Sequence, residues 1–137
     1  MAGQGKLFIT GFAVVGLFLF GGWSLGGTRA AERKAQAGAP DAVKVDPKHY
    51  KVELENDRVR VVRITYGPRE KSVMHGHRAG IGVFLTDSHF KFTYPNGKTE
   101  EINGEKGKFL WFDKAWAHLP ENLNDAPFEA VYIGLKR

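Results

Sequence analysis

The chain has 137 residues, a net charge of +5 at neutral pH and no cysteine. The absence of cysteine excludes disulfides, thiolate metal ligands and a cysteine nucleophile. The charge is spread along the chain, because residues 1–45 hold five Lys/Arg against two Asp/Glu and residues 46–137 hold 15 against 13. No basic stripe interleaves with aromatic residues, so nucleic acid is not an expected partner.

The first predicted element is an apolar segment, LFITGFAVVGLFLFGGWSL, at residues 7–25. An uncharged helix of about 20 residues is long enough to cross the hydrocarbon core of a bilayer. We therefore expect residues 1–27 to be an N-terminal transmembrane anchor or an uncleaved signal, with a helix over about 6–27. A cleaved secretory signal is the alternative, although the apolar region of such a signal is usually only about 7–15 residues long.

The residues that flank this segment give conflicting indications of orientation. Arg29, Arg33 and Lys34 follow it, and the positive-inside rule would place them in the cytoplasm together with the C-terminal domain. A short tail ahead of an apolar run is instead how exported proteins begin. We expect a single-pass membrane protein with its C-terminal domain in the periplasm, and we expect the basic residues beside the span to contact membrane lipid.

Residues 28–47 are small, polar and aperiodic, which predicts a linker. From residue 48 onward, short β-rich runs alternate with turn signals, of which Asn96-Gly97 is a strong hairpin signal. Nine strands are predicted, at 50–55, 58–66, 71–77, 81–86, 89–94, 98–102, 108–112, 115–119 and 128–136. Short strands at even spacing are typical of an all-β barrel or sandwich. A jelly roll of about eight strands is the natural arrangement for a domain over residues 48–137.

Two histidines, His75 and His77, lie one residue apart in a predicted strand, so their side chains share one face. His118 lies on a later predicted strand whose alternation gives it the same face as Trp116, and strands this far apart in sequence can be neighbours in a barrel. Neutral imidazoles suit zinc, iron, copper or nickel. The alternative for His75 and His77 is an exposed polar face. The remaining histidines are expected at the surface: His49 and His89.

The motifs around these histidines resemble those of the cupin superfamily. That family has a glycine, an H-x-H pair, a glutamate and a glycine in its first motif, and a glycine, a P-x-G turn, a histidine and an asparagine in its second. In this chain Gly67 and Gly104 match the leading glycines loosely, and Asn122 matches the asparagine. The histidine positions of both motifs are matched by His75, His77 and His118.

Over about residues 50–136 the chain is similar to the small single-domain bacterial cupins. The resemblance implies a double-stranded β-helix and a divalent metal (Fe, Zn, Ni or Cu) held by the three motif histidines. The family's glutamate is missing, because its place falls at Ile81 or Gly82, and Asp113-Lys114-Ala115 replaces the P-x-G turn. At most three imidazole ligands therefore remain, as in the cupin thiol dioxygenases.

Two classes of function follow, and whether the protein is an enzyme stays open. The first is a membrane-tethered, metal-dependent, dioxygenase-like enzyme, with Trp116 walling a small-molecule pocket inside the barrel. The second is a non-catalytic accessory subunit that docks on a larger integral membrane complex through its transmembrane helix and its cupin domain. Gly22 and Gly26 have the spacing that lets two helices approach closely in lipid.

Overall fold

The structure is a computed structural model that describes residues 30–31, 34 and 38–136. The predicted transmembrane helix over about 6–27 lies outside the described residues, and so do residues 28–29, 32–33 and 35–37 of the predicted linker. Within the described part of the chain, no helix has the length and apolar character needed to cross a bilayer. The anchor, its orientation and the domain boundaries therefore stay predictions.

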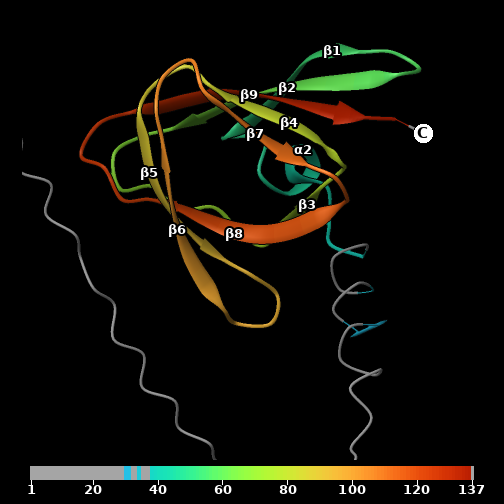
Figure 1. The fold of residues 1–137 in the computed structure, drawn as a ribbon, viewed down its shortest axis with the longest axis horizontal. Helices are drawn as coiled ribbons and strands as arrows, with labels where there is room; N and C mark the ends of the chain where they lie inside the picture. Colours follow the sequence, from blue (N-terminus) through green and yellow to red (C-terminus); the bar gives the residue numbers. More distant parts are fainter. Residues whose placement is uncertain (1–29, 32–33, 35–37, 137) are drawn as a thin grey trace, which may run out of the picture.

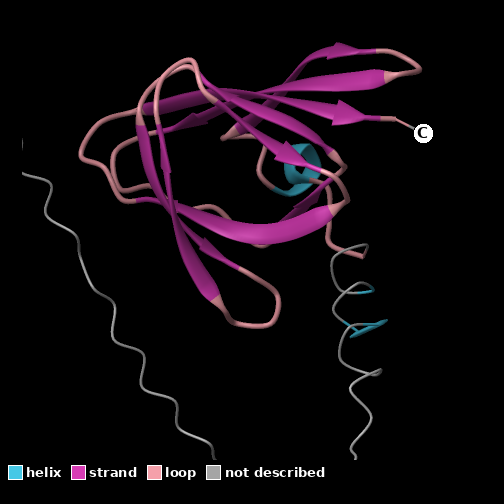
Figure 2. Ribbon diagram, viewed as in Figure 1, coloured by secondary structure: helices cyan, strands magenta, loops and turns pink. Residues whose placement is uncertain are grey.

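The strands form two facing antiparallel sheets (Figure 1). The five-stranded sheet has the order β1 (Tyr50–Glu55), β2 (Val59–Tyr66), β9 (Phe128–Leu135), β4 (Gly80–Phe84) and β7 (Phe109–Phe112). The four-stranded sheet has the order β3 (His75–His77), β8 (Trp116–Asn122), β5 (Ser88–Thr93) and β6 (Thr99–Gly104). The chain crosses repeatedly from one sheet to the other, which gives the barrel-like double-stranded β-helix seen in Figure 2.

All nine predicted strands are present in the described residues, most of them with slightly different ends, and two differ more clearly in extent from the prediction. The run at 71–77 narrows to β3, whose three residues are the histidine pair and the glycine between them. The run at 115–119 continues through Pro120 to Asn122. Pro120 has no N–H to donate, but it still pairs with Phe92 on β5, and its carbonyl accepts a hydrogen bond from the backbone N–H of Ser72.

The core lies between the sheets and is largely aromatic. In β9, alternate residues point inward, so that Phe128, Ala130 and Tyr132 are buried while their neighbours are half-exposed. Val62 and Tyr66 do the same on β2, beside β9. This period-2 pattern is the one expected of a strand with one face on a core. Burial of each large apolar side chain contributes about 1.5–3 kcal/mol.

Two glycines allow strands to approach closely. A Cβ at Gly80 would lie 2.2 Å from the carbonyl oxygen of Ile133 on the neighbouring strand β9. A Cβ at Gly104 would lie 2.5 Å from the ring of Phe84. Both distances are shorter than van der Waals contact. Any residue larger than glycine at these positions would therefore require a shift of the backbone or of a core ring.

The segment before β1 packs on the barrel instead of standing free. It contains a short helix, α2 (Ala42–Val45), whose N-cap Asp41 accepts a hydrogen bond from the backbone N–H of Val43. Ala42 is buried. The backbone N–H of Gly76 donates to the carbonyl of Pro40 at 2.8 Å. Residues 40–46, which the sequence assigns to the linker, thus lie against β3, the strand that carries the histidine pair.

Candidate metal centre

Strand pairing brings the three motif histidines together. β3 pairs antiparallel with β8, so that His75 lies opposite His118 and His77 lies opposite Trp116. Directly opposed residues on neighbouring strands have Cβ atoms about 4.5–5.5 Å apart. The forty residues between the two histidine motifs in the sequence are spanned by β4 to β7, and the barrel then returns the chain to the side of β3.

The imidazole nitrogens converge inside the barrel. One ring nitrogen from each of His75, His77 and His118 lies within 4.8 Å of the others, and the Nε2 atoms of His75 and His77 are 3.0 Å apart. Ligand nitrogens at about 2.0–2.1 Å from a shared metal are separated by about 3.0–3.4 Å. The His75–His77 separation already falls in this range, and His118 completes a group of three.

These imidazoles are neutral at physiological pH, because burial disfavours the charged form. Burial lowers the pKa of His75 to about 4, although a hydrogen bond to the Val73 carbonyl opposes the shift. Burial also lowers the pKa values of His77 and His118 well below the usual histidine value, and the neighbouring imidazoles add to the effect. A neutral imidazole has a nitrogen lone pair to offer to a metal.

The hydrogen bonds around the site fit a metal ligand set. His75 donates from Nδ1 to the carbonyl oxygen of Val73 at 2.8 Å, which leaves the lone pair on Nε2, the atom that faces His77. His118 is 3% exposed, and neither of its ring nitrogens has a hydrogen-bond partner. A buried polar group without a partner costs about 1–3 kcal/mol. A metal ion coordinated by His118 would satisfy one of these two nitrogens, so the residues fit the group that the sequence predicts.

The site has no carboxylate ligand. Ile81 and Gly82, which stand where the family's glutamate is expected, lie on β4 and pair with Ile133 and Tyr132 of β9. Within the described residues, the group that could hold an ion consists of histidines alone. Asn122, the last residue of the second motif, has a structural role: its side-chain amide donates to the carbonyls of Gly67 and Ala126.

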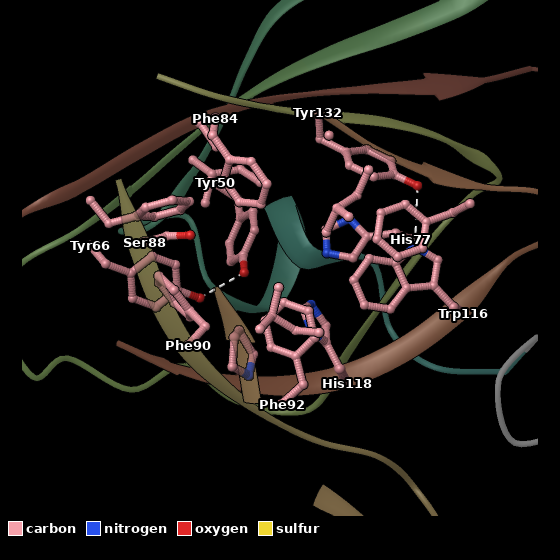
Figure 3. A pocket seen from close by; sticks show the side chains of 18 residues that line it. Tyr50, Tyr66, His77, Phe84, Ser88, Phe90, Phe92, Trp116, His118 and Tyr132 are labelled. Carbon is pink, nitrogen blue, oxygen red and sulfur yellow. Dashed lines mark hydrogen bonds between the residues drawn. The ribbon is translucent and has the colours of Figure 1, made fainter. Parts of the chain in front are cut away.

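An apolar cavity of about 70 Å³ opens beside the histidines (Figure 3). A single water needs about 10–15 Å³ on the same measure, so the cavity admits a few waters or a very small organic group. His77 and His118 form part of its wall together with the aromatic side chains of Tyr66, Phe90 and Phe92. None of the described residues that line it carries a charged side chain.

Trp116 lies where the sequence places it, in the wall of this cavity. Its ring stacks on Phe112 at a centroid distance of 4.2 Å and on His77 at 5.0 Å. The indole Nε1 donates to the Tyr132 hydroxyl at 3.1 Å. With both faces packed and its donor satisfied, the indole holds the His77 ring in place while it lines the cavity.

The prediction that His49 lies at the surface is wrong. His49 is 5% exposed, its Nδ1 lies 2.6 Å from Asp46 Oδ2 and its Nε2 lies 2.9 Å from Glu70 Oε2. Its ring also stacks on Tyr66 at 4.1 Å. Asp46 lies 3 residues before His49 and Glu70 lies 21 residues after it. The contact with Glu70 could not be predicted from the sequence, because the two residues are far apart in it. We call Asp46, His49 and Glu70 the ionic cluster.

The ionic cluster reaches toward the metal centre through Ser72. The Ser72 hydroxyl donates to Asp46, and its oxygen lies 3.5 Å from His75 Nδ1. Burial raises the pKa of Asp46, but the hydrogen bonds from Ser72 and His49 outweigh it and hold that pKa below the usual value. The fifth histidine, His89, is remote from both groups and pairs at the surface with Glu101 at 2.7 Å.

Comparison with known proteins supports the fold. No family model and no curated protein matches the chain. Among solved structures, a cupin domain from Bordetella pertussis is similar, with 22% identity, a TM-score of 0.59 and coverage of 64% of this chain and 92% of that one. A cupin superfamily protein from Desulfitobacterium hafniense has 13% identity and a TM-score of 0.49, over 64% of this chain and 76% of that one. Together with the strand order, the first likeness shows that the chain has the cupin fold, and it carries no function over.

Proposed function

We propose that the protein is a metal-binding cupin-fold protein in which His75, His77 and His118 hold one divalent transition metal. The observation that carries this proposal is His118, a buried histidine with both ring nitrogens unpartnered, aimed at two other neutral imidazoles. A set of imidazoles without carboxylates suits Fe, Zn, Ni or Cu better than Mg or Mn.

The metal centre serves an oxidative, dioxygenase-like reaction on a small molecule. When bound, a redox-active metal would supply the site for oxygen activation and the Lewis acidity that substrate binding needs. The chain itself excludes water with aromatic rings and fixes the His77 ring between Trp116 and the barrel wall. We assign substrate contact to Trp116, because it lines the cavity and stacks on His77, one of the proposed metal ligands.

Acid–base chemistry is poorly supported by the same cavity. Burial raises the pKa of Tyr132 to about 12 and raises that of Tyr50 well above its usual value. These phenols hold their protons at neutral pH, and no carboxylate lines the described wall. A general base works best when its pKa lies near the working pH, and no group here meets that requirement.

An accessory role is the second candidate. The missing carboxylate ligand favours it, and so do two large apolar side chains on the edge strand β7, Phe109 and Trp111, which are 64% and 58% exposed. In this alternative the barrel docks on a larger membrane complex. In both cases we propose that residues 7–25 anchor the chain and that the barrel lies in the periplasm.

The test is elemental analysis of the full-length chain, purified in detergent and offered Fe, Zn, Ni and Cu in turn. We expect about one ion per chain with at least one of these metals, and none in a variant that lacks all three histidines. If none of the metals binds in stoichiometric amount, the metal proposal fails and the accessory role becomes the better account. Oxygen consumption by the iron-loaded protein then separates an enzyme from a metal-binding accessory subunit.

A further inference from the structure

A second hollow lies next to the metal centre, outside the barrel cavity. It has a volume of about 320 Å³ and is bounded by α2, β2, the end of β3 and β9. His77 and Tyr132 line both this hollow and the barrel cavity. One ligand histidine of the metal centre is therefore reached from two sides, from an apolar interior and from this hollow.

The hollow exists because small residues surround it. Nearly half of the residues that line it are alanines or glycines, contributed by four separate parts of the fold: Ala39, Ala42, Gly76, Ala115 and Gly134. Larger side chains at these positions would fill the space. The remaining wall combines two valines with polar side chains, and unlike the barrel cavity it holds charged ones: Asp41, Arg60 and Arg78.

The two arginines of this wall differ in their ion pairs. Arg60 pairs with Asp41 through Nη1 and with Glu55 through Nε, although at 3.5 Å from Glu55 the buried Nε makes no hydrogen bond. Arg78 forms no side-chain hydrogen bond or ion pair with any residue that the structure describes. Arg60 thus has two carboxylate partners, and Arg78 is the guanidinium of this wall that has none among the described residues.

The backbone of Arg78 is held by a hydrogen bond, while the residue itself is exposed. The Tyr132 hydroxyl donates to the Arg78 carbonyl, and the same hydroxyl accepts from Trp116 Nε1 at 3.1 Å. The backbone that carries the unpaired guanidinium is thus held by the aromatic side chains that also pack on His77. A guanidinium presents its donors in a rigid fork that matches the two oxygens of a carboxylate.

We propose that this hollow binds the carboxylate of a small organic acid, with Arg78 as the main contact and Arg60 beside it. The uncharged remainder of the molecule points toward His77. The inference rests on the proposed function in one respect: it identifies small monoanionic carboxylic acids as the substrate class of the metal centre. The binding itself rests only on the hollow and its arginines.

The experiment is calorimetric titration of the full-length protein in detergent with sodium butyrate, and with butyramide as the uncharged isostere. Both the metal-loaded and the chelator-treated protein are used. We expect butyrate to bind in both states and to bind at least about tenfold more tightly than butyramide, since charge-assisted hydrogen bonds are the stronger ones.

Two variants and one control locate the binding. Arg78→Gln should weaken butyrate binding about tenfold, and Ala115→Phe, at an exposed position, should weaken it by filling the hollow. Arg69→Gln is the matched control, because Arg69 is an exposed arginine paired with Asp125 on another loop, and it should leave the affinity unchanged. Circular dichroism of each variant should match that of the unsubstituted chain.

Three results would overturn the inference: no butyrate binding, equal affinity for butyrate and butyramide, or an affinity that Arg78→Gln does not change. Binding that requires the metal and ignores Arg78 would mean that the metal alone holds the carboxylate. Metal content is measured on the same samples, so a chain that binds no metal but binds butyrate through Arg78 would contradict the proposed function and leave this inference standing.

Discussion

The same residue type performs two opposite tasks within one small barrel. In the metal centre, His75, His77 and His118 are neutral and crowd together, and neither ring nitrogen of His118 has a hydrogen-bond partner. In the ionic cluster, His49 is clamped between two carboxylates, and both of its nitrogens face an oxygen. The difference shows that burial alone does not define a histidine's role. The partners do, since imidazole nitrogens that face one another can share a metal ion, whereas the nitrogens of His49 are already engaged by two carboxylates.

The largest effect that would test this comparison is the loss of His49. Hydrogen bonds to charged groups contribute about 1.5–3 kcal/mol each, so losing the two that join His49 to the carboxylates of Asp46 and Glu70 costs about 3–6 kcal/mol. We expect His49→Ala to lower the free energy of unfolding in denaturant by this amount and to leave the metal content near that of the unsubstituted chain. A loss of metal without a loss of stability would reverse the roles we assign to the two groups.

The complementary change is His118→Ala. Altering residues behind a metal ligand typically costs 10–100-fold in affinity, so removal of a ligand itself should cost more than about 100-fold. Metal at 100 times its Kd should stabilise the unsubstituted chain by about 2.7 kcal/mol and should not stabilise the variant. Thermal unfolding with and without metal measures both. An equal metal-induced shift in the two proteins would show that His118 is not a ligand.

A smaller effect is expected for Glu70, in the dependence of the free energy of unfolding on pH at acidic pH. The hydrogen bonds of Glu70 to Lys48, the Gly67 N–H and His49 lower its pKa to about 2 from the usual 4.5. Because the folded pKa lies below the unfolded one, its contribution is complete above about pH 5 and is lost as the pH falls toward 2. Glu70→Gln should flatten the stability curve in that window. An unchanged slope would show that other carboxylates control acid unfolding.

The smallest effect is expected for His89→Ala. His89 pairs with Glu101 at the surface, and exposed ion pairs contribute about 0–1 kcal/mol. Stability should change by no more than about 0.5 kcal/mol, a change within the range of ordinary surface substitutions, and metal content should not change. A large effect here would mean that histidine substitutions perturb the barrel in general, and the contrast between the two groups would lose its support.

Much of the fold could be predicted because turn residues separate the strands and because period-2 alternation places His75 and His77 together. The alternation fails where every residue is apolar. The run Phe109–Phe112 could face the core with either half, and a slip of one residue reverses the faces. Trp111 on this run is 58% exposed on the edge strand β7, and the sequence pattern does not indicate that side.

The parts of the site that the sequence did not reveal depend on contacts between distant segments. His49 meets Glu70 across 21 residues, and a histidine at the entrance of a domain reads as solvated when its partner is unknown. The packing of residues 40–46 on β3 likewise depends on a backbone hydrogen bond to Gly76, which has no residue signature. The three histidines were predictable because their spacing matches a motif, and only the geometry shows that His118 lacks any other partner.

The hydrogen bond from Gly76 to Pro40 has a mechanical consequence. Gly76 lies between the two histidines of β3, and a Cβ there would lie 3.1 Å from Ala39. The segment before α2 is therefore in close contact with β3 at this point. A displacement of the chain at Pro40 would act through this hydrogen bond on the strand that carries His75 and His77. The segment at Ala39 and Pro40 is therefore in direct contact with the strand that holds two of the proposed metal ligands, and its position is coupled to theirs.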